Sequence, residues 1–325
     1  MFVSGGRREG SRMDDERDRR PNTEPFCEGM DAPPSLDEPA DEVVDRPRRR
    51  REEDRAWVPV IVKRTDQSTR HPDDVLVSAI EVGLEQLNRP TLSLGLSSIA
   101  AGLILGFTAM AVGIATVAVA PLEQWPMVGR LLVAVAYPLG FVICVTSGAE
   151  LFTEHTATAV YPVLDRKSSF ARLLRLWAIV AAGNLVGAFF SAGLLTLAEP
   201  VIGAREGYIE LGRHLVTPSA LSLLISAILA GWLMALGAWL VVATQPGLSQ
   251  IVSIYIVTFL IGLGGLHHSI AGSVEMFAAI LASDEFGLAQ AARFTSLALV
   301  GNLIGGSFFV AVLNYAHIRE TQRTD

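Results

Sequence analysis

A long run without charge constrains this chain more than any other feature of its sequence. Between His214 and Glu275 there is no Asp, Glu, Lys or Arg. A helix of about 20 mostly apolar residues crosses the hydrocarbon core of a bilayer, so the run is long enough for two spans. It also contains the stretch GGLHHSIAGSVEMF, where two adjacent histidines flanked by glycines precede a carboxylate. The run therefore predicts membrane helices with titratable side chains among them.

Six apolar stretches of spanning length follow one another along the chain, and nearly all the charge outside the N-terminal segment lies in the short connections between them. The expected spans are 92–119, 129–149 with a continuation past Thr153, 171–198, 219–243, 251–281 and 289–316. This pattern predicts an all-α membrane protein with six transmembrane helices.

The segments outside the spans differ from them in composition. Residues 1–75 are crowded with charge and proline, and such a segment cannot bury enough apolar surface to offset its ordering entropy. A disordered cytoplasmic tail is therefore expected there. Residues 76–90 alternate apolar and polar positions at helical spacing, which suits an amphipathic helix on the membrane surface or a helical linker. The six-helix domain is expected at 76–318, followed by a short tail at 319–325.

Basic residues indicate the orientation. The connection after the second span contains Arg166 and Lys167, and Arg172 and Arg175 lie just inside the next helix. Because cytoplasmic connections are enriched in Lys and Arg, this side is predicted to be cytoplasmic. An even number of spans then places both termini in the cytoplasm.

The spans also repeat. AAGNLVGAFF in the third resembles LVGNLIGGSFF in the sixth, and Asn184 and Asn302 are 118 residues apart. The same shift places His268 on Glu150, within SGAELFTEHTATAV. Three spans per half predict two inverted repeats whose second and fifth helices are broken and meet near the midplane, as in transporters. The alternative is that the GN-L-x-G motif marks only small-residue helix packing.

Four motifs resemble the formate/nitrite transporter family over residues 76–318. SGAELFT resembles the signature of its second helix, RLLRLWAIVAAGNLVGAFF its third, HHSIAG its fifth and GNLIGG its sixth. The fuller match is to a divergent branch with a charged N-terminal tail. The resemblance implies an aquaporin-like bundle with its own pore, five protomers in a ring, and passage of small monovalent anions such as formate, nitrite or hydrosulfide.

The resemblance also implies roles for particular residues. Leu151, Phe152 and Thr153 match a constriction of the second helix, and His268 matches the central pore histidine. Asn184 and Asn302 match asparagines that hold the broken segments, and Glu150 matches a residue that ties the break to backbone amides.

Physical chemistry supports a pore role for His268. An anion in an apolar tunnel is costly, whereas the neutral form of a weak acid is far less so. A neutral imidazole can donate a hydrogen bond to the anion or pass it a proton. A helix–helix hydrogen bond is the alternative for a membrane histidine. His267 cannot share a helical face with its neighbour and is expected to support the loop. Thr153 is expected to cap the continuation helix and offer its hydroxyl to the substrate.

Three departures from the family pattern stand out. The family's lysine between the third and fourth helices is missing, with Arg213 or His214 as candidate replacements. Gly272 stands where the family has asparagine. Glu154 and Glu275 are extra carboxylates, each interpreted as a possible proton relay; for Glu275 a structural hydrogen bond is an equal alternative.

The hypothesis is a proton-linked channel or transporter for small weak-acid anions in a bacterial inner membrane. Its alternatives are a channel for a small neutral solute and a non-conducting scaffold or sensor acting through the tail. No nucleophile–base pair, phosphate loop or metal-ligand spacing indicates an enzyme. No cofactor and no nucleic-acid partner are expected; the expected partners are the anion, the lipid bilayer and four further copies of the chain.

Overall fold

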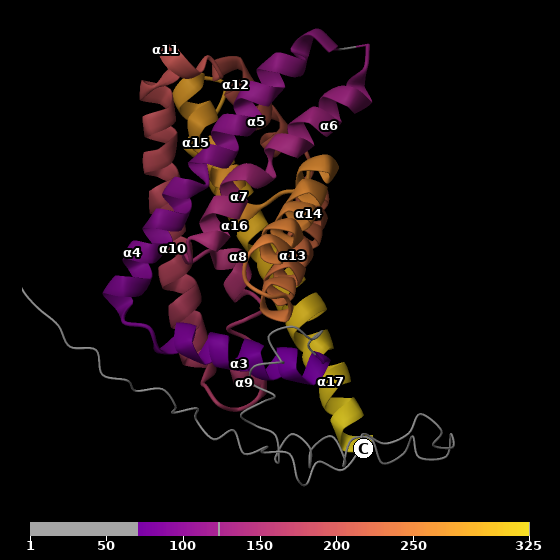
Figure 1. Cartoon of the computed structure of the whole chain (residues 1–325). Helices are drawn as coiled ribbons and strands as arrows, with labels where there is room; N and C mark the ends of the chain where they lie inside the picture. Colours follow the sequence, from indigo (N-terminus) through magenta and orange to yellow (C-terminus); the bar gives the residue numbers. More distant parts are fainter. Residues whose placement is uncertain (1–70, 123, 325) are drawn as a thin grey trace, which may run out of the picture. The chain divides into compact units, whose positions relative to one another are not determined.

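The computed structural model describes residues 71–122 and 124–324, and within them all regular structure is helical (Figure 1). Of the disordered tail predicted over residues 1–75, residues 1–70 lie outside the described residues. The helices are α3 (Pro72–Asn88), α4 (Thr91–Ile104), α5 (Gly106–Val119), η2 (Ala120–Leu122), α6 (Pro126–Ala136), α7 (Pro138–Thr146), α8 (Phe152–His155), α9 (Tyr161–Leu164), α10 (Phe170–Leu197), α11 (Glu199–Ile202), α12 (Arg205–Val216), α13 (Ala220–Ala243), α14 (Leu248–Gly264), α15 (Ser269–Ala282), α16 (Leu288–Gly306), the π-helical η3 (Ser307–Val312) and α17 (Leu313–Thr324).

All six predicted apolar stretches are helical in the structure. Five are long and apolar enough to span a membrane: Thr91–Leu122, Pro126–Thr146, Phe170–Leu197, Ala220–Ala243 and Leu288–Thr321. The remaining stretch, predicted at 251–281, is the helix pair α14 and α15, which is bent by 51° at the break between them. The prediction of an all-α membrane protein is confirmed. The last span continues as α17 through most of the segment expected to be a short tail.

The GN-L-x-G motifs bring pairs of helices into close contact. A Cβ at Gly187 of α10 would lie 2.2 Å from the carbonyl oxygen of Ile99 in α4. A Cβ at Gly305 of α16 would lie 2.1 Å from the carbonyl oxygen of Ile228 in α13. Only glycine permits such an approach, as small residues do at membrane helix interfaces. The packing role considered as an alternative is therefore real, and it stands beside the role of the motif asparagines described below.

The helix α3 differs from the expectation in extent and setting. It begins at Pro72, with the ring of His71 accepting a hydrogen bond from the amide of Asp73, so residues 72–75 belong to it. Its apolar face, centred on Leu76 and Ile80, is buried. The helix contacts α9, α10, α13 and α17. The bundle itself therefore covers the apolar face of this helix.

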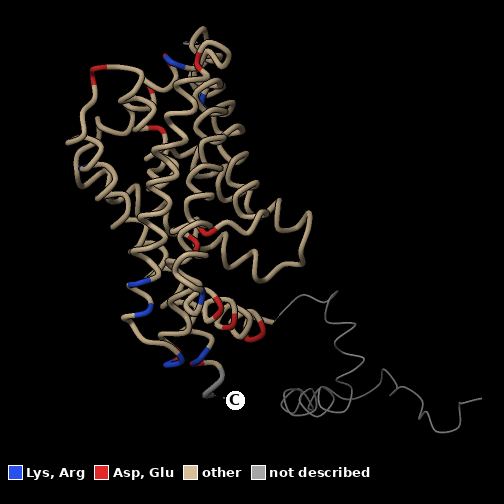
Figure 2. Tube along the Cα trace, turned by 90° about the vertical axis from the view of Figure 1, so that its left-hand side faces the viewer, with Lys and Arg blue, Asp and Glu red and all other residues tan. Residues whose placement is uncertain are grey.

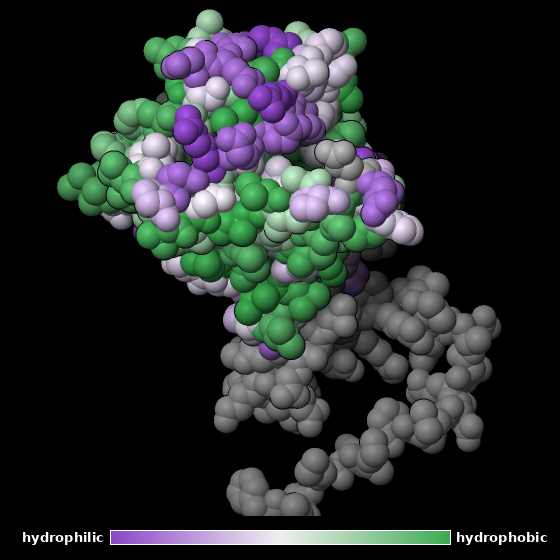
Figure 3. Space-filling view, turned by 90° about the horizontal axis from the view of Figure 1, so that it is seen from above, coloured by the Kyte–Doolittle hydropathy of each residue, from purple (hydrophilic) through white to green (hydrophobic). Residues whose placement is uncertain are grey.

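The two ends of the bundle differ from its middle. Figure 2 shows Lys, Arg, Asp and Glu gathered toward both ends, with few between them. The helices α3 and α17, near the two ends of the described chain, lie together at one end of the bundle, and α11 and α12 lie at the other (Figure 1). Figure 3, seen from the α12 end, shows hydrophilic residues gathered there and hydrophobic ones along the sides.

Candidate functional site

Two helix breaks meet in the middle of the bundle. The helix α7 ends at Thr146 and α8 begins at Phe152, whereas α14 ends at Gly264 and α15 begins at Ser269. Each break contains a left-handed glycine, Gly148 with φ 68° and Gly265 with φ 59°. Because L residues with a Cβ rarely adopt this conformation, the glycines that mark both stretches in the sequence are where the chain turns.

Asn184 and Asn302 form matching hydrogen bonds at the two breaks. The side-chain oxygen of Asn184 accepts from the amide of Phe152 at 2.9 Å, and that of Asn302 accepts from the amide of Ser269 at 2.8 Å. The side-chain nitrogen of Asn184 donates to the carbonyls of Ser98 and Glu150. That of Asn302 donates to the carbonyls of Ala227 and His267. Both amides are fully buried, so each satisfies backbone groups that its helix break leaves free.

These bonds correct the register taken from the sequence by one residue. The side-chain nitrogens of the two asparagines donate to the carbonyls of Glu150 and His267, so these two residues correspond. The side-chain oxygens accept from the amides of Phe152 and Ser269, so these two correspond as well. His268 therefore corresponds to Leu151, not to Glu150, and each of these two residues is the N-cap of its helix. A constant shift of 118 fails because the spacing from break to asparagine differs by one residue between the halves.

His268 is fixed by hydrogen bonds at both ring nitrogens. Its Nδ1 accepts from the amides of Ile270 and Ala271, each at 3.2 Å, and so caps α15. Its Nε2 lies 3.0 Å from the hydroxyl oxygen of Thr153. Since Nδ1 accepts, the neutral ring has its hydrogen on Nε2 and donates it to Thr153. The ring is 1% exposed and meets the edge of Phe141 at a centroid distance of 4.9 Å.

Thr153 does not cap α8, contrary to the expectation. The N-cap is Leu151, whose side chain cannot accept a hydrogen bond, and Asn184 binds the Phe152 amide instead. The Thr153 hydroxyl is used across the break, on His268.

A cavity of about 1030 Å³ leads from the α12 end of the bundle down to His268. We call it the His268 cavity. Its lining is mainly apolar, and its polar members are Thr116, Arg130, Tyr137, Glu206, Glu210, Arg213, His214, His268 and Glu275. Leu151, Phe152 and Thr153 are buried and are not part of this lining. In the described structure the open space thus ends at His268, and the three residues matched to a constriction lie outside it.

Glu275 and Gly272 share a face of α15 with His268. The three residues are spaced at i, i+4 and i+7 along one continuous helix, and all of them line the His268 cavity. A Cβ at Gly272 would lie 2.4 Å from Cζ of Phe294. The absence of a side chain at 272 is therefore explained by the Phe294 ring, which occupies the space.

Glu150 contacts the buried His155 and the partly exposed Arg89, a residue that the sequence did not single out. One carboxylate oxygen of Glu150 contacts the guanidinium of Arg89, and the other contacts the His155 ring. The Glu150 amide donates to the hydroxyl of Ser97 at 3.2 Å. Glu150 therefore ties the break to the end of α3, as well as to Asn184. The partly buried Glu154 precedes His155 on α8, away from the His268 cavity.

His267 forms its hydrogen bonds with Ser226 of α13. Its Nδ1 lies 2.7 Å from the hydroxyl of Ser226, and its amide donates to the same oxygen at 3.2 Å. Its ring stacks on that of His214 at a centroid distance of 5.2 Å and 6° between planes. His267 does not line the His268 cavity.

The comparisons with known proteins agree with this architecture. A family model described as formate/nitrite transporter matches residues 73–316. The chain belongs to the formate/nitrite transporter family. The Escherichia coli (strain K12) "Inner membrane protein YfdC" is 33% identical over 241 residues, covering 73% of this chain and 76% of that protein. The Bacillus subtilis (strain 168) "Uncharacterized transporter YrhG" is 29% identical over 272 residues, covering 78% and 96%.

Two solved structures share the fold. An "FNT family ion channel" has a TM-score of 0.65 at 21% identity, covering 76% of this chain and 98% of that one. A "Pentameric formate channel with formate bound" has a TM-score of 0.60 at 19% identity, covering 70% and 98%. The family predicted from the four motifs is therefore confirmed. Its members are channels and transporters, so this protein is a membrane channel or transporter and not an enzyme.

The candidates proposed to replace the family's lysine behave differently from one another. Arg213 forms ion pairs with Glu285 at 2.7 Å and with Glu210 at 3.2 Å, which neutralise it. His214 has its Nε2 3.0 Å from the carbonyl oxygen of Gly265. Arg130 of α6, which the sequence analysis did not select, donates from Nε to the carbonyl of Leu263 at 2.6 Å.

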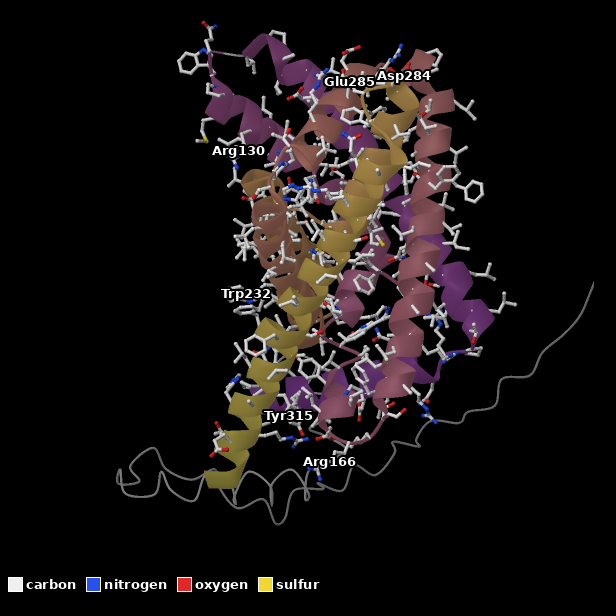
Figure 4. All side chains as sticks on the ribbon, turned by 180° about the vertical axis from the view of Figure 1, so that it is seen from behind. Arg130, Arg166, Trp232, Asp284, Glu285 and Tyr315 are labelled. Atoms are coloured by element: carbon white, nitrogen blue, oxygen red, sulfur yellow. The ribbon has the colours of Figure 1, made fainter. Side chains whose placement is uncertain are left out.

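Arg130 stands out because no carboxylate of the described residues forms an ion pair with it, although it lines the His268 cavity. Figure 4 shows it toward the end that also holds Asp284 and Glu285. Arg130 lies near the start of α6, and a single arginine there gave no signal in the sequence, since such residues are common near membrane helix ends.

Proposed function

We propose that this protein passes small monovalent weak-acid anions, such as formate, nitrite or hydrosulfide, across an inner membrane along a path beside His268. The observation that supports the proposal is the His268 cavity, which runs from one end of the bundle to a buried imidazole where the two broken helices meet. A buried titratable side chain at such a place in a membrane protein is a functional-site hypothesis by default.

Two features of this cavity favour an anion, although Glu206 and Glu210 also line its outer part. Arg130 gives its outer part a positive charge without a carboxylate partner in the described structure. The N-terminus of α15 points toward its inner end at His268, and helix N-termini favour negative charge. Beyond His268 the path is proposed to pass Thr153 and then Phe152 and Leu151. The apolar side chains of Phe152 and Leu151 oppose a bare anion and admit a neutral acid at much lower cost.

His268 is proposed to donate its Nε2 hydrogen to the arriving anion in place of Thr153. In the structure Nε2 of His268 and the hydroxyl oxygen of Thr153 are 3.0 Å apart. The Thr153 hydroxyl is therefore close enough to form a second hydrogen bond to an anion bound at Nε2. Proton linkage is part of the proposal, because a substrate that crosses the apolar constriction as a neutral acid takes one proton with each anion.

We also propose that Asn184, Asn302, Glu150 and His267 hold the two breaks, that the two halves are inverted repeats, and that five copies assemble. The matching hydrogen bonds of the two asparagines support the repeat. The shared fold with a pentameric formate channel supports the assembly. The basic residues Arg166, Lys167, Arg172 and Arg175 support a cytoplasmic location of both termini.

The test is uptake into proteoliposomes of labelled formate, nitrite and hydrosulfide, supplied one at a time. His268→Asn is the informative variant, since asparagine is also a good N-cap but has no imidazole. The control is His317→Ala, which removes an exposed histidine of α17. We expect uptake by the wild type and the control, with a large reduction in His268→Asn. If the wild type takes up none of these anions, the proposal is excluded. Permeation by glycerol or urea instead would favour a neutral-solute channel. The absence of any flux would favour a non-conducting scaffold.

A further inference from the structure

We propose that Glu275, and not His268, is the group that hands a proton to the substrate anion in the His268 cavity. The inference rests on the function proposed above and names the proton donor within that same path. For this carboxyl group the sequence allowed two alternatives, a proton relay or a structural hydrogen bond, and the inference selects the first.

The placement of Glu275 is the first argument. It lies two helical turns beyond His268 on α15 and lines the same cavity, so an anion moving from the α12 end passes it before reaching His268. The residue is only 5% exposed. Among the described residues, none forms a hydrogen bond or ion pair with the carboxyl oxygens of Glu275. A structural hydrogen bond to a neighbouring helix is therefore not what holds this carboxyl.

The other titratable groups that line the His268 cavity are less suited than Glu275 to be the proton donor. From the elements around α15 these are Arg130 of α6, Tyr137 at the start of α7, and Glu206, Glu210, Arg213 and His214 of α12. The packed helices α4, α5, α10 and α16 contribute no titratable side chain to the lining. Glu206, Glu210, Arg213 and His214 are exposed at the α12 end, where Arg213 is paired with Glu210. Tyr137 is buried near His268, stacked on Phe141.

Charge repulsion gives the second argument. An ionised carboxylate that is only 5% exposed, in a largely apolar cavity, repels an approaching anion, because its buried surroundings screen the two charges less than bulk water does. The same carboxyl in its protonated form has one O–H donor. Such a donor forms a short, strong hydrogen bond to an anion. The cavity accepts an anion beside Glu275 only while Glu275 holds a proton.

The transfer step balances in atoms and charge. The O–H bond of the Glu275 carboxylic acid breaks, and an O–H bond forms on a carboxylate or nitrite substrate, or an S–H bond on hydrosulfide. Glu275 remains as a carboxylate and the substrate leaves as its neutral acid toward His268 and the constriction. A hydronium ion from water in the open end of the cavity then restores the Glu275 proton. One anion and one proton cross together, with no net charge moved.

The hydrogen bonds of His268 are the third argument. To hold a second proton, its Nδ1 would have to release two backbone amides that it caps, and the new N–H would point at both donors. To donate from its neutral form, it would have to give up its one N–H hydrogen and become an imidazolate. His268 is therefore placed to hold the substrate by a hydrogen bond from Nε2, and the mobile proton must come from elsewhere.

This mechanism defines the substrate class. Anions of weak acids take a proton from a carboxylic acid readily, whereas chloride and nitrate do not. The protein should therefore accumulate formate or hydrosulfide together with protons and should discriminate against chloride and nitrate of similar size and charge.

Proteoliposomes with an internal pH dye and a clamped membrane potential test the inference with formate as the probe. The wild type should acidify the interior by one proton per formate, independently of the potential. Glu275→Gln keeps size and hydrogen bonding but holds no transferable proton, so acidifying uptake should fall on the order of 100-fold. Asp284→Asn, an exposed acidic residue at the same end that does not line the cavity, is the charge-matched control and should match the wild type (Figure 4). His268→Asn should transport slowly but still with one proton per formate.

A second measurement uses the wild-type protein and does not depend on the folding of a variant. A carbodiimide reacts with protonated carboxyl groups in apolar surroundings. It should modify Glu275, formate should protect the residue, and acidifying uptake should be lost in proportion to the modification found by peptide mapping. Uptake that survives full modification of Glu275, or a Glu275→Gln protein with the wild-type proton count and pH profile, overturns the inference. A wild type that moves no formate, nitrite or hydrosulfide instead overturns the function on which it rests.

Discussion

The imidazole of His268 and the hydroxyl of Thr153 join the two broken helices, with Nε2 and Oγ1 3.0 Å apart and both side chains buried. His268 is the N-cap of α15, and Thr153 lies in the first turn of α8. Each break thus fixes the position of a group in the other, although the two residues are 115 positions apart in the sequence.

Replacing Thr153 should reveal the energy of this contact. Thr153→Val has nearly the same shape but leaves the buried N–H of His268 without an acceptor, which costs about 1–3 kcal/mol. Thr153→Ser keeps the hydroxyl. We expect the melting temperature of the purified protein in detergent to fall clearly for Thr153→Val and little for Thr153→Ser. Equal losses for both would mean that the methyl group, and not the hydroxyl, matters at this position.

Removing either asparagine amide should destabilise the protein by a similar amount. Asn302→Ala loses hydrogen bonds to Ser269, Ala227 and His267 and leaves buried backbone groups unsatisfied, each at about 1–3 kcal/mol. Asn184→Ala loses the matching set. Asn88→Ala, an exposed asparagine bonded only to Arg172 in the described structure, should change stability by less than about 0.5 kcal/mol. Thermal melts of the three variants provide the comparison, and a large loss in Asn88→Ala alone would contradict it.

These examples show which parts of the structure the sequence could predict. The spans were found because hydrophobic length is a local property of the chain. The two breaks were found because glycine and polar residues interrupt otherwise apolar helices. The one-residue difference between the two breaks could not be found, since a fixed shift assumes the same spacing from break to asparagine in both halves of the chain.

The charged partners were also beyond the reach of the sequence. Arg213 was a candidate to attract anions, but in the structure it pairs with Glu285, 72 residues further on. Arg89 gave no signal, yet it meets Glu150, 61 residues away. Which cation neutralises which carboxylate depends on how the helices pack, and the spacing of charges along the chain does not report that.

Gly272 should tolerate a side chain only if Phe294 is made smaller. Gly272→Ala places a Cβ 2.4 Å from the Phe294 ring, so overpacking should cost about 1–3 kcal/mol. Adding Phe294→Leu should recover part of this loss, although Phe294→Leu alone should also destabilise the protein. Melting temperatures of the two single variants and the double variant form a cycle. Strictly additive losses would show that the two residues do not compete for the same space.

Asp165 should make stability depend on pH at the end where α17 lies. Burial alone would raise the pKa of Asp165, but hydrogen bonds from Lys167, Tyr315 and Arg319 outweigh it and hold the pKa below its ordinary value of 3.8. A lowered pKa means that the stabilisation is present above about pH 3.8 and is lost as the pH falls through the lower folded-state value. The difference in melting temperature between the wild type and Asp165→Asn should therefore be constant near neutral pH and shrink below pH 3.8. A difference that grows on acidification would refute the assignment.

Arg130 should govern how anions enter the His268 cavity, and the dependence on salt should identify its effect. Arg130→Gln removes a charge that no carboxylate of the described residues neutralises, so uptake from the cavity side should need about 10-fold more substrate at low ionic strength. The defect should shrink near 0.5 M of an impermeant salt, because the screening length falls below the roughly 10 Å found at 0.1 M. Arg166→Gln removes an equal charge at the opposite end of the bundle and should leave this uptake unchanged (Figure 4). The measurement is formate uptake over a series of formate concentrations at two salt levels. If the defect of Arg130→Gln were the same at both salt levels, the path would require the hydrogen bond of Arg130 to Leu263 and not its charge.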